Sequence, residues 1–310
     1  MNHPHAGRNR PKTTPLRTGA RAMAVPVLLL ALALFVPLSA QCQEQEDGPF
    51  LTLETGLTGE AEFDESRAGV GASSLAVEGG WDWLTLRYQR TDYSWSDKED
   101  LPFGDRSHDP WDTLQVIALA SEHNGMFNQD WGWIAGLEVS AAFEEELSGS
   151  LGVSAYGGGV YMISDQTMVT FGLGLSAHET GLDFLPLLMV GWDGVGQDGS
   201  GWFGGLGIPQ TMLGYSFSER FSLALELGMD GTTYRLADDS TVWSKGYVEH
   251  DEMDLSLAAT WHPLENLSVT LAPSYRFGRS MTIYDEDGEK QDSHDLDNTW
   301  GLNLDLSFAF

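Results

Sequence analysis

The sequence is poor in cysteine and in basic residues. Its 310 residues include one cysteine, Cys42, which excludes a disulfide scaffold and a CxxC-type zinc or redox site. There are 46 acidic residues against 16 basic ones, a formal net charge of −30. A nucleic-acid-binding protein needs a basic face against the phosphates, so no nucleic-acid partner is expected. Aromatic residues make up 11% of the chain, too many for a solvated disordered tail, so a folded domain is expected.

The few basic residues are concentrated at the N-terminus. Residues 1–22 carry five of them and no acidic residue, and an apolar run follows from Met23 to Val36. A basic segment, a short apolar run and a small-residue exit at Ala40 predict a secretory signal peptide over residues 1–40. Translation could start at Met1 or Met23. The segment 41–48 is expected to be a short N-terminal piece. Because Gln41 precedes Cys42, lipidation is not expected. Removing the signal would leave 16 − 5 = 11 basic residues against 46 acidic ones.

The remaining chain alternates with a period of two residues. At its end, Trp300, Leu302, Leu304, Leu306, Phe308 and Phe310 share one face of an extended strand, and polar or small residues share the other. Such a strand fits a water-soluble sheet over a core or a membrane barrel with lipid outside. Thirteen segments have strand character: 50–60, 68–81, 83–95, 112–121, 131–143, 149–163, 166–177, 184–192, 201–217, 221–235, 246–261, 267–283 and 299–310.

The lengths of these segments and of their connections favour the barrel. Most are at least as long as the roughly 9–11 residues that a tilted strand needs to cross a bilayer. Short connections such as 164–165 and 218–220 occur together with long acidic ones at 96–110 and 284–298, a mixture typical of outer-membrane barrels. We therefore predict an all-β, antiparallel, up-and-down transmembrane β-barrel over residues 49–310. Twelve strands are preferred, with fourteen as the alternative if 201–217 divides at Pro209.

Aromatic residues gather near the ends of the predicted strands. Amphipathic rings prefer the boundary between membrane and water, so they suggest two girdles, and ordinary core positions are the alternative. The residues concerned are Trp81, Trp83, Tyr93, Trp95, Trp111, Trp131, Trp133, Trp192, Trp202, Trp243, Trp261 and Trp300.

The C-terminus resembles the terminal strand of Gram-negative outer-membrane proteins. In those proteins a final phenylalanine behind alternating apolar residues is the label read by the barrel-assembly machinery. The matching residues here are Leu302, Leu304, Leu306, Phe308 and Phe310. The resemblance implies a place in the outer membrane of a Gram-negative bacterium, with the bilayer, lipopolysaccharide and the assembly machinery as partners.

Four other stretches resemble an uncharacterised outer-membrane β-barrel family, domain of unknown function 6268. They are 184–192 (FLPLLMVGW), 205–209 (GLGIP), 213–217 (LGYSF) and 272–279 (APSYRFGR). Since no catalytic residue is assigned to that family, the resemblance implies a fold and no chemistry.

The inner wall of such a barrel is where charged strand residues should lie. A charge facing lipid costs about 2–4 kcal/mol at the midplane, so Arg87, Arg276 and Asp305 are expected to point inward. Gln89 shares the face of Arg87, opposite Leu84, Leu86 and Tyr88. These four residues are the candidates for the lumen lining. If much of the acid faced the lumen, a pore would favour cations. Most of the acidic residues fall in predicted loops, however, and solubility or a saline habitat is the preferred explanation of the acidity.

Catalytic and metal-binding motifs are weak. His178 and His250 lie beside carboxylates, and such a pair could activate a serine or water, but no GxSxG motif accompanies them. The run 285–289 (DEDGE) lacks the spacing of a calcium loop, and its Asp-Gly step is typical of a hairpin turn. No catalytic residue, cofactor or specific metal site is therefore expected, although the acidic loops could bind divalent cations diffusely.

Three functions remain open. The first is a passive porin-like channel for small polar solutes with a preference for cations. The second is a structural or interaction barrel with an occluded lumen and acidic, cation-binding extracellular loops. A barrel hydrolase is third.

Overall fold

The computed structural model describes residues 48–310 of the chain. The predicted signal peptide, its cleavage site and Cys42 lie outside the described residues. Within the described part there is no helix long and apolar enough to cross a membrane.

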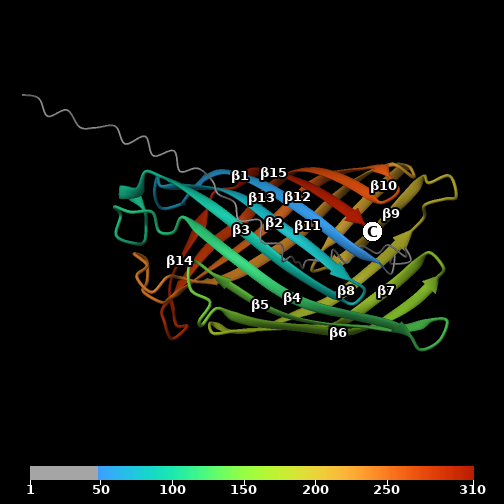
Figure 1. Cartoon of the computed structure of the whole chain (residues 1–310), viewed down its shortest axis with the longest axis horizontal. Helices are drawn as coiled ribbons and strands as arrows, with labels where there is room; N and C mark the ends of the chain where they lie inside the picture. Colours follow the sequence, from blue (N-terminus) through green and yellow to red (C-terminus); the bar gives the residue numbers. More distant parts are fainter. Residues whose placement is uncertain (1–47) are drawn as a thin grey trace, which may run out of the picture. The chain divides into compact units, whose positions relative to one another are not determined.

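The described chain is a single meandering sheet (Figure 1). Each strand pairs antiparallel with the next along the chain, from β1 to β13, and β13 pairs with β15. The strands are β1 (Pro49–Glu62), β2 (Gly69–Trp81), β3 (Leu84–Ser96), β4 (Thr113–Met126), β5 (Trp131–Phe143), β6 (Leu151–Ser164), β7 (Thr167–His178), β8 (Gly181–Asp193), β9 (Gly201–Ile208), β10 (Thr211–Ser218), β11 (Phe221–Arg235), β12 (Tyr247–Leu264), β13 (Leu267–Tyr284), β14 (Lys290–Leu296) and β15 (Thr299–Ala309). A 3₁₀ turn, η1 (Lys98–Asp100), lies in the connection between β3 and β4.

The sheet closes on itself because the last long strand pairs with the first. β15 runs alongside β1 from Phe50↔Ala309 to Thr58↔Gly301, and alongside β13 on its other edge. β14 pairs with the C-terminal part of β13, from Arg279 to Tyr284, whereas β15 pairs with its N-terminal part. β14 and β15 therefore count as one strand position of the barrel. The closed barrel therefore has 14 strands. The predicted transmembrane β-barrel is confirmed, and the preference for twelve strands is wrong.

The count differs because every early segment is a full strand and the segment 201–217 divides. Proline has no N–H for a ladder, and the chain turns at Pro209 between β9 and β10. The predicted connection 284–298 also needs correction, because β14 occupies 290–296 within it. The Asp-Gly turn predicted there joins β13 to β14, with Asp285 Oδ1 accepting from the backbone of Asp287 and Glu289.

The strand register separates two faces. On β15, Leu302, Leu304 and Leu306 are each at least 38% exposed and pair with apolar residues of β1 or β13, whereas Asn303 and Asp305 lie on the opposite face. Exposed apolar side chains continue around the whole outer wall, among them Leu51, Leu75, Leu137, Phe171, Leu188, Leu206, Leu225 and Leu257. A continuous apolar belt outside and polar groups inside are the pattern of a barrel whose outer wall meets hydrocarbon.

The two ends of the barrel differ. Both ends of the closed wall, Pro49 and Phe310, meet at one end, where the Phe310 N–H donates to the Pro49 carbonyl over 2.9 Å. Two-residue turns such as 82–83 and 165–166 also lie there. We call this the short-turn end. The opposite end carries the connections 97–112 and 236–246 and is called the long-loop end.

The aromatic residues belong to both predicted environments. Trp81, Trp202, Trp261 and Trp300 are more than half exposed on the outer wall, as girdle residues should be. Tyr93, Trp95 and Trp111 instead lie inside, in or against a buried cluster at the long-loop end, so the girdle interpretation is wrong for these three.

Whether hydrocarbon surrounds the barrel can be tested by introducing a lysine at either of two adjacent positions, one on each face. Leu304→Lys would place a charge in the apolar belt and should lower the free energy of unfolding by about 2–4 kcal/mol. Asn303→Lys, on the inner face beside acidic groups, should change it far less. Denaturant unfolding in lipid vesicles measures both. Equal losses for the two variants would contradict the assignment of faces.

The exposed end of β15 yields a second prediction. Phe310 is 72% exposed and follows the outward row of β15, so its removal costs the folded wall little. Deleting Phe310 should lower the amount of barrel assembled in cells while leaving refolding of purified chain into vesicles near the wild-type rate. Loss of refolding in vitro as well would show a structural role in place of a label.

Candidate functional site

The inner wall is the candidate site, and most of its charged side chains are acidic. The register places three arginines there, Arg87, Arg276 and Arg279. The acidic residues outnumber them: Glu54, Glu78, Glu122, Glu138, Glu226, Asp230, Glu252, Asp254 and Asp305. Their excess gives the inner wall a negative charge.

The first inner group lies between β1, β3 and β15. Arg87 Nη2 donates to Glu54 Oε2 over 2.8 Å and to Gln89 Oε1 over 2.9 Å. Asp305 is the cross-strand partner of Glu54. The Arg87 and Glu54 side chains are 14% and 27% exposed, so this group is in contact with water inside the barrel.

The second group lies further toward the long-loop end. Glu252 accepts from Arg276 Nη1 over 2.6 Å and from Arg279 Nε over 3.1 Å. Both arginines can face inward because β13 bulges at Gly278, whose φ of +59° suits glycine. The extra residue shifts the alternation, so that Arg276 and Arg279 reach the same carboxylate.

Of the four predicted lining residues, Arg87, Gln89 and Asp305 lie in or beside the first group and Arg276 lies in the second. Within these two groups, the residues missed by sequence reasoning are Glu54, Glu252 and Arg279, and the other inner carboxylates were not predicted either. The inward direction of Glu54 could have been predicted from the alternation of Leu51, Leu53 and Leu57 around it. The inward direction of Arg279 could not have been predicted, because a regular alternation from Arg276 would put Arg279 on the outer wall.

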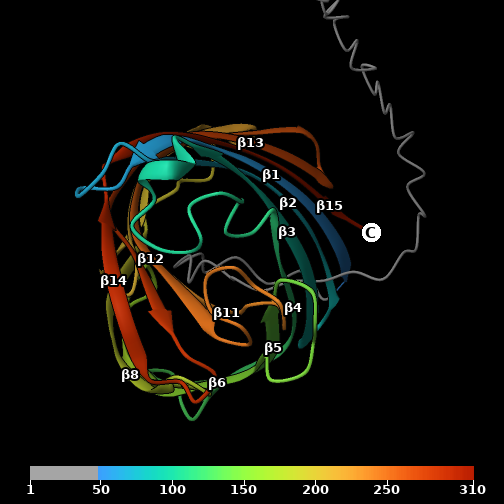
Figure 2. The ribbon, with the colours of Figure 1, turned by 90° about the vertical axis from the view of Figure 1, so that its left-hand side faces the viewer.

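The connection 97–112 folds into the barrel at the long-loop end. Figure 2 shows this segment, in teal, inside the ring of strands. Leu101, Phe103 and Trp111 are at most 8% exposed and pack against inward side chains of the wall. Trp111 stacks on Phe103 and makes an edge contact with Trp95, with ring centroids 5.1 Å apart in the second pair. We call this segment the plug.

Polar contacts outside the membrane hold the plug in shape. Lys98 Nζ lies 2.6 Å from Asp109 Oδ1. Asp105 accepts from the backbone N–H groups of Ser107 and His108 and from the His108 ring, and the last contact contributes most to holding the pKa of Asp105 below its usual range.

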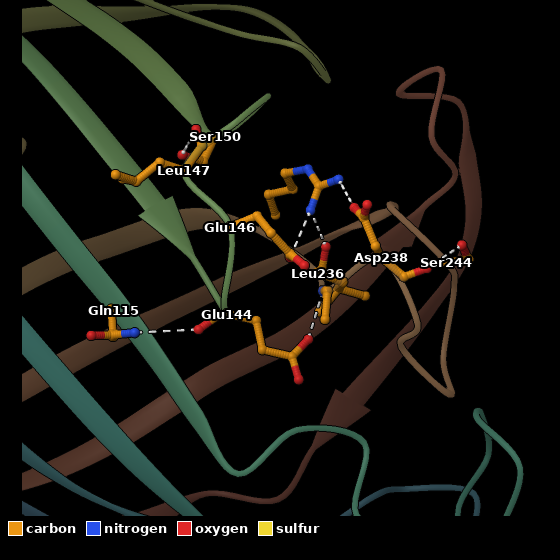
Figure 3. A network of polar contacts seen from close by, with 10 residues as sticks. Gln115, Glu144, Glu146, Leu147, Ser150, Leu236, Asp238 and Ser244 are labelled. Atoms are coloured by element: carbon orange, nitrogen blue, oxygen red, sulfur yellow. Dashed lines mark hydrogen bonds and ion pairs between the residues drawn. The ribbon is translucent and has the colours of Figure 1, made fainter.

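The end of β11 crosses the interior and joins β5 (Figure 2). Arg235 pairs with Phe143 in parallel, and the Glu144 N–H donates to the Arg235 carbonyl over 2.9 Å. Arg235 itself is held by Glu146, the Leu236 carbonyl and Asp238 (Figure 3). Its hydrogen bond lowers the pKa of Asp238, whereas burial raises the pKa of Glu144. The sheet therefore curls inward at the long-loop end, and the buried Arg235 side chain holds it there.

Among the described residues, neither His178 nor His250 has a serine hydroxyl as a hydrogen-bond partner. His250 lies among aromatic rings, with Nδ1 3.2 Å from the Tyr93 hydroxyl, and His178 Nδ1 lies 3.5 Å from Thr180 Oγ1. A serine does contact His123, with Ser121 Oγ 3.1 Å from Nε2, on the outer face of β4. Within residues 48–310 no carboxylate bonds to that imidazole, so the third member of a triad is lacking there. The described part of the chain also has no His/Cys/Asp/Glu group arranged to hold a metal ion.

No family model matches the chain, so the resemblance to domain of unknown function 6268 stays a prediction. No curated protein matches it either.

Solved structures do show similarity. The KdgM porin in complex with disordered oligogalacturonate is 6% identical, with a TM-score of 0.36, and the match covers 84% of this chain and 99% of that one. An outer-membrane channel from Pseudomonas putida F1 is 13% identical, with a TM-score of 0.40, over 85% and 96% of the two chains. OprB of Pseudomonas putida is 10% identical, with a TM-score of 0.36, over 85% and 93%.

Burial of the plug predicts a large effect for one tryptophan and a small one for another. Trp111 is 2% exposed, and Trp111→Ala should lower the free energy of unfolding by about 3–5 kcal/mol, because it leaves a large cavity. Trp243, 39% exposed at the same end, is the matched control, and Trp243→Ala should stay within about 0.5 kcal/mol. Protease added outside vesicles should cleave the 97–112 segment faster in the first variant only. Equal cleavage in both variants would contradict the buried position of Trp111.

Proposed function

We propose that this protein is an outer-membrane channel for small polar solutes, gated at its extracellular end by the plug. The observation that carries the proposal is the division of the wall into an apolar outer belt and a water-accessible, charged inner face. A barrel that served only as a wall would not need inner carboxylates that stay in contact with water, because desolvated charges are costly.

The orientation follows from the two ends. In outer-membrane barrels short turns face the periplasm and long loops face outward. The short-turn end, which holds Pro49 and Phe310, is thus the periplasmic end, and the plug faces the outside. The acidic connections at that end would meet lipopolysaccharide and divalent cations there.

Cation preference is supported by the excess of carboxylates on the inner wall. Glu54 and Asp305 lie side by side with one arginine to compensate them. Fixed negative charges in a narrow passage concentrate cations and repel anions. Salt would weaken this preference, since mobile ions screen the wall.

The occluded barrel remains the second candidate, favoured by the plug. Its buried aromatic side chains pack inside the barrel at the long-loop end, which supports an obstructed passage there. Passage of solutes therefore requires the 97–112 segment to move, and the two functions differ in whether it does.

Planar-bilayer recording of the purified barrel separates the two candidates. The wild-type chain should show brief single-channel steps, and the Phe103→Ala/Trp111→Ala double variant should stay open longer, because the plug has lost its buried anchors. A gel-mobility assay of heat-modifiable folding checks that the variant is still a barrel. Silence of both folded chains at all voltages would favour the occluded barrel.

Ion selectivity provides an independent prediction. Under a potassium chloride gradient the reversal potential should indicate cation preference. Arg87→Gln should increase it by removing the compensating cation, and Glu54→Gln/Asp305→Asn should decrease it. The opposite signs serve as mutual controls. An unchanged reversal potential in both would place the conducting path elsewhere.

A further inference from the structure

Two charged residues lie on the outer wall, on the side of the barrel that faces the membrane. Arg90 of β3 pairs across the sheet with Leu75 of β2, and Asp92 pairs with Ser73 of the same strand. Directly opposite residues of an antiparallel pair share one face of the sheet. Leu75 is 45% exposed in the apolar belt. Arg90 and Asp92 therefore point outward.

The two charged side chains form one polar network with Thr113 of β4. Asp92 Oδ1 accepts from Arg90 Nε over 2.9 Å, from Arg90 Nη2 over 2.6 Å and from Thr113 Oγ1 over 2.7 Å. Arg90 Nη2 also donates to Thr113 Oγ1 over 3.2 Å. Together with the neighbouring Ser73, which is exposed, these residues are called the outer patch.

The outer patch keeps hydrogen-bond donors that its own network does not use. A guanidinium carries five N–H groups, and the bonds within the patch leave from Nε and Nη2 of Arg90. The two N–H groups of Nη1 are left over. The Arg90 and Asp92 side chains are 51% and 50% exposed, so the remaining donors face the surroundings of the barrel. No other arginine or lysine lies on β1, β2 or β4, the strands around the patch.

The outer patch lies in the half of the apolar belt toward the long-loop end. β3 begins at Leu84, at the short-turn end, and Arg90 comes six residues later (90 − 84 = 6). A rise of about 3.3 Å per residue at a tilt of about 40° places Arg90 roughly 15 Å above Leu84, in a belt about 25 Å tall. In the outward row of β3, Leu84 and Leu86 precede Arg90, whereas Asp92 and Ser94 follow it. The outward row therefore changes from apolar to polar at this height.

Charged donors at this depth need partners that hydrocarbon does not supply. A long side chain near the boundary of the membrane reaches the oxygens of lipid head groups, and arginine binds phosphate through several N–H groups at once. The head groups at the long-loop end are those of the outer leaflet. In a Gram-negative outer membrane they belong to lipopolysaccharide, whose innermost sugars carry phosphates.

The wall below the outer patch suits the acyl chains of the same lipid. Tyr88 pairs with Ile117, and Leu86 pairs with Leu119, on the outer face of β3 and β4. Ile117 is 38% exposed and Leu119 44%. Polar groups toward the outside and apolar groups toward the membrane centre follow the order of a lipid. A free phosphate would gain nothing from the apolar pairs.

We propose that the outer patch binds a phosphate of lipopolysaccharide. Arg90 Nη1 and the Ser73 hydroxyl would donate to the phosphate, while Asp92 and Thr113 position the guanidinium. The acyl chains would lie along the outer faces of β3 and β4 below the patch. The proposal uses the outward direction of the long-loop end, but it does not require the barrel to conduct.

Native mass spectrometry of the purified barrel in detergent tests the proposal with three lipids: bisphosphorylated lipid A, the same lipid without its phosphates, and phosphatidylglycerol. The wild-type chain should bind the first at least about fivefold more tightly than the second, because charge-assisted bonds to the phosphate are lost. Arg90→Gln should abolish this preference. Arg220→Gln, which removes an exposed arginine at the short-turn end, is the matched control and should keep it.

A second variant separates the loss of the guanidinium from repulsion by the carboxylate left behind. Arg90→Gln/Asp92→Asn removes both charges and should also lack the preference, and it replaces the single variant if that chain does not fold. Heat-modifiable gel mobility checks folding.

Three results would overturn the proposal. The first is a wild-type chain that does not distinguish the two forms of lipid A, and the second is a folded Arg90 variant that still does. The third is phosphatidylglycerol bound as tightly as lipid A, which would replace lipopolysaccharide by a phospholipid. Conductance does not enter the measurement, so failure of the site and failure of the proposed channel are distinguishable.

Discussion

The structure depends on one constraint: in hydrocarbon every backbone N–H and C=O must find a partner within the protein. The meander satisfies it by pairing each strand with the next and β15 with β1, which leaves no edge over most of the wall. Once the ring is closed, the side chains along each strand alternate between the outer face and the lumen. The outer row of β15 and the inner row containing Asp305 are both consequences of that closure.

The same pairing constraint makes the irregular places in the wall notable. The ladder is broken where β9 and β10 stop short, and β11 leaves the wall at the same height to bond with β5. The plug fills the lumen on the other side of β11, where Tyr234 and Val248 face inward into the buried cluster. The long-loop half of the barrel therefore holds a buried cluster and an irregular wall, while the short-turn half keeps a regular wall.

The charged side chains of the inner wall are also unevenly distributed. The arginines on the inner wall lie in two groups: Arg87 of β3 bonds to Glu54 of β1, two strands away, and Arg276 and Arg279 of β13 bond to Glu252 of the adjacent β12. Both groups are at most partly exposed, and each arginine is held by hydrogen bonds to a strand close by in the wall. On the inner faces of β8 and β10, Leu185, Leu187, Met189 and Met212 follow one another, with Asp183 beyond them toward the long-loop end.

Alternation from Trp300 to Phe310 by itself determined a two-faced strand, and its repetition along the chain determined the barrel, because strand periodicity is a local property of the backbone. It also sufficed to point Arg87 and Asp305 away from lipid. Only the tertiary structure decided the number of strands, since Pro209 is equally compatible with a bend or a turn. It also decided the burial of Trp111 and the inward direction of Arg279, because a loop that folds back and a bulge at Gly278 depend on contacts between segments far apart in sequence, which no local pattern records.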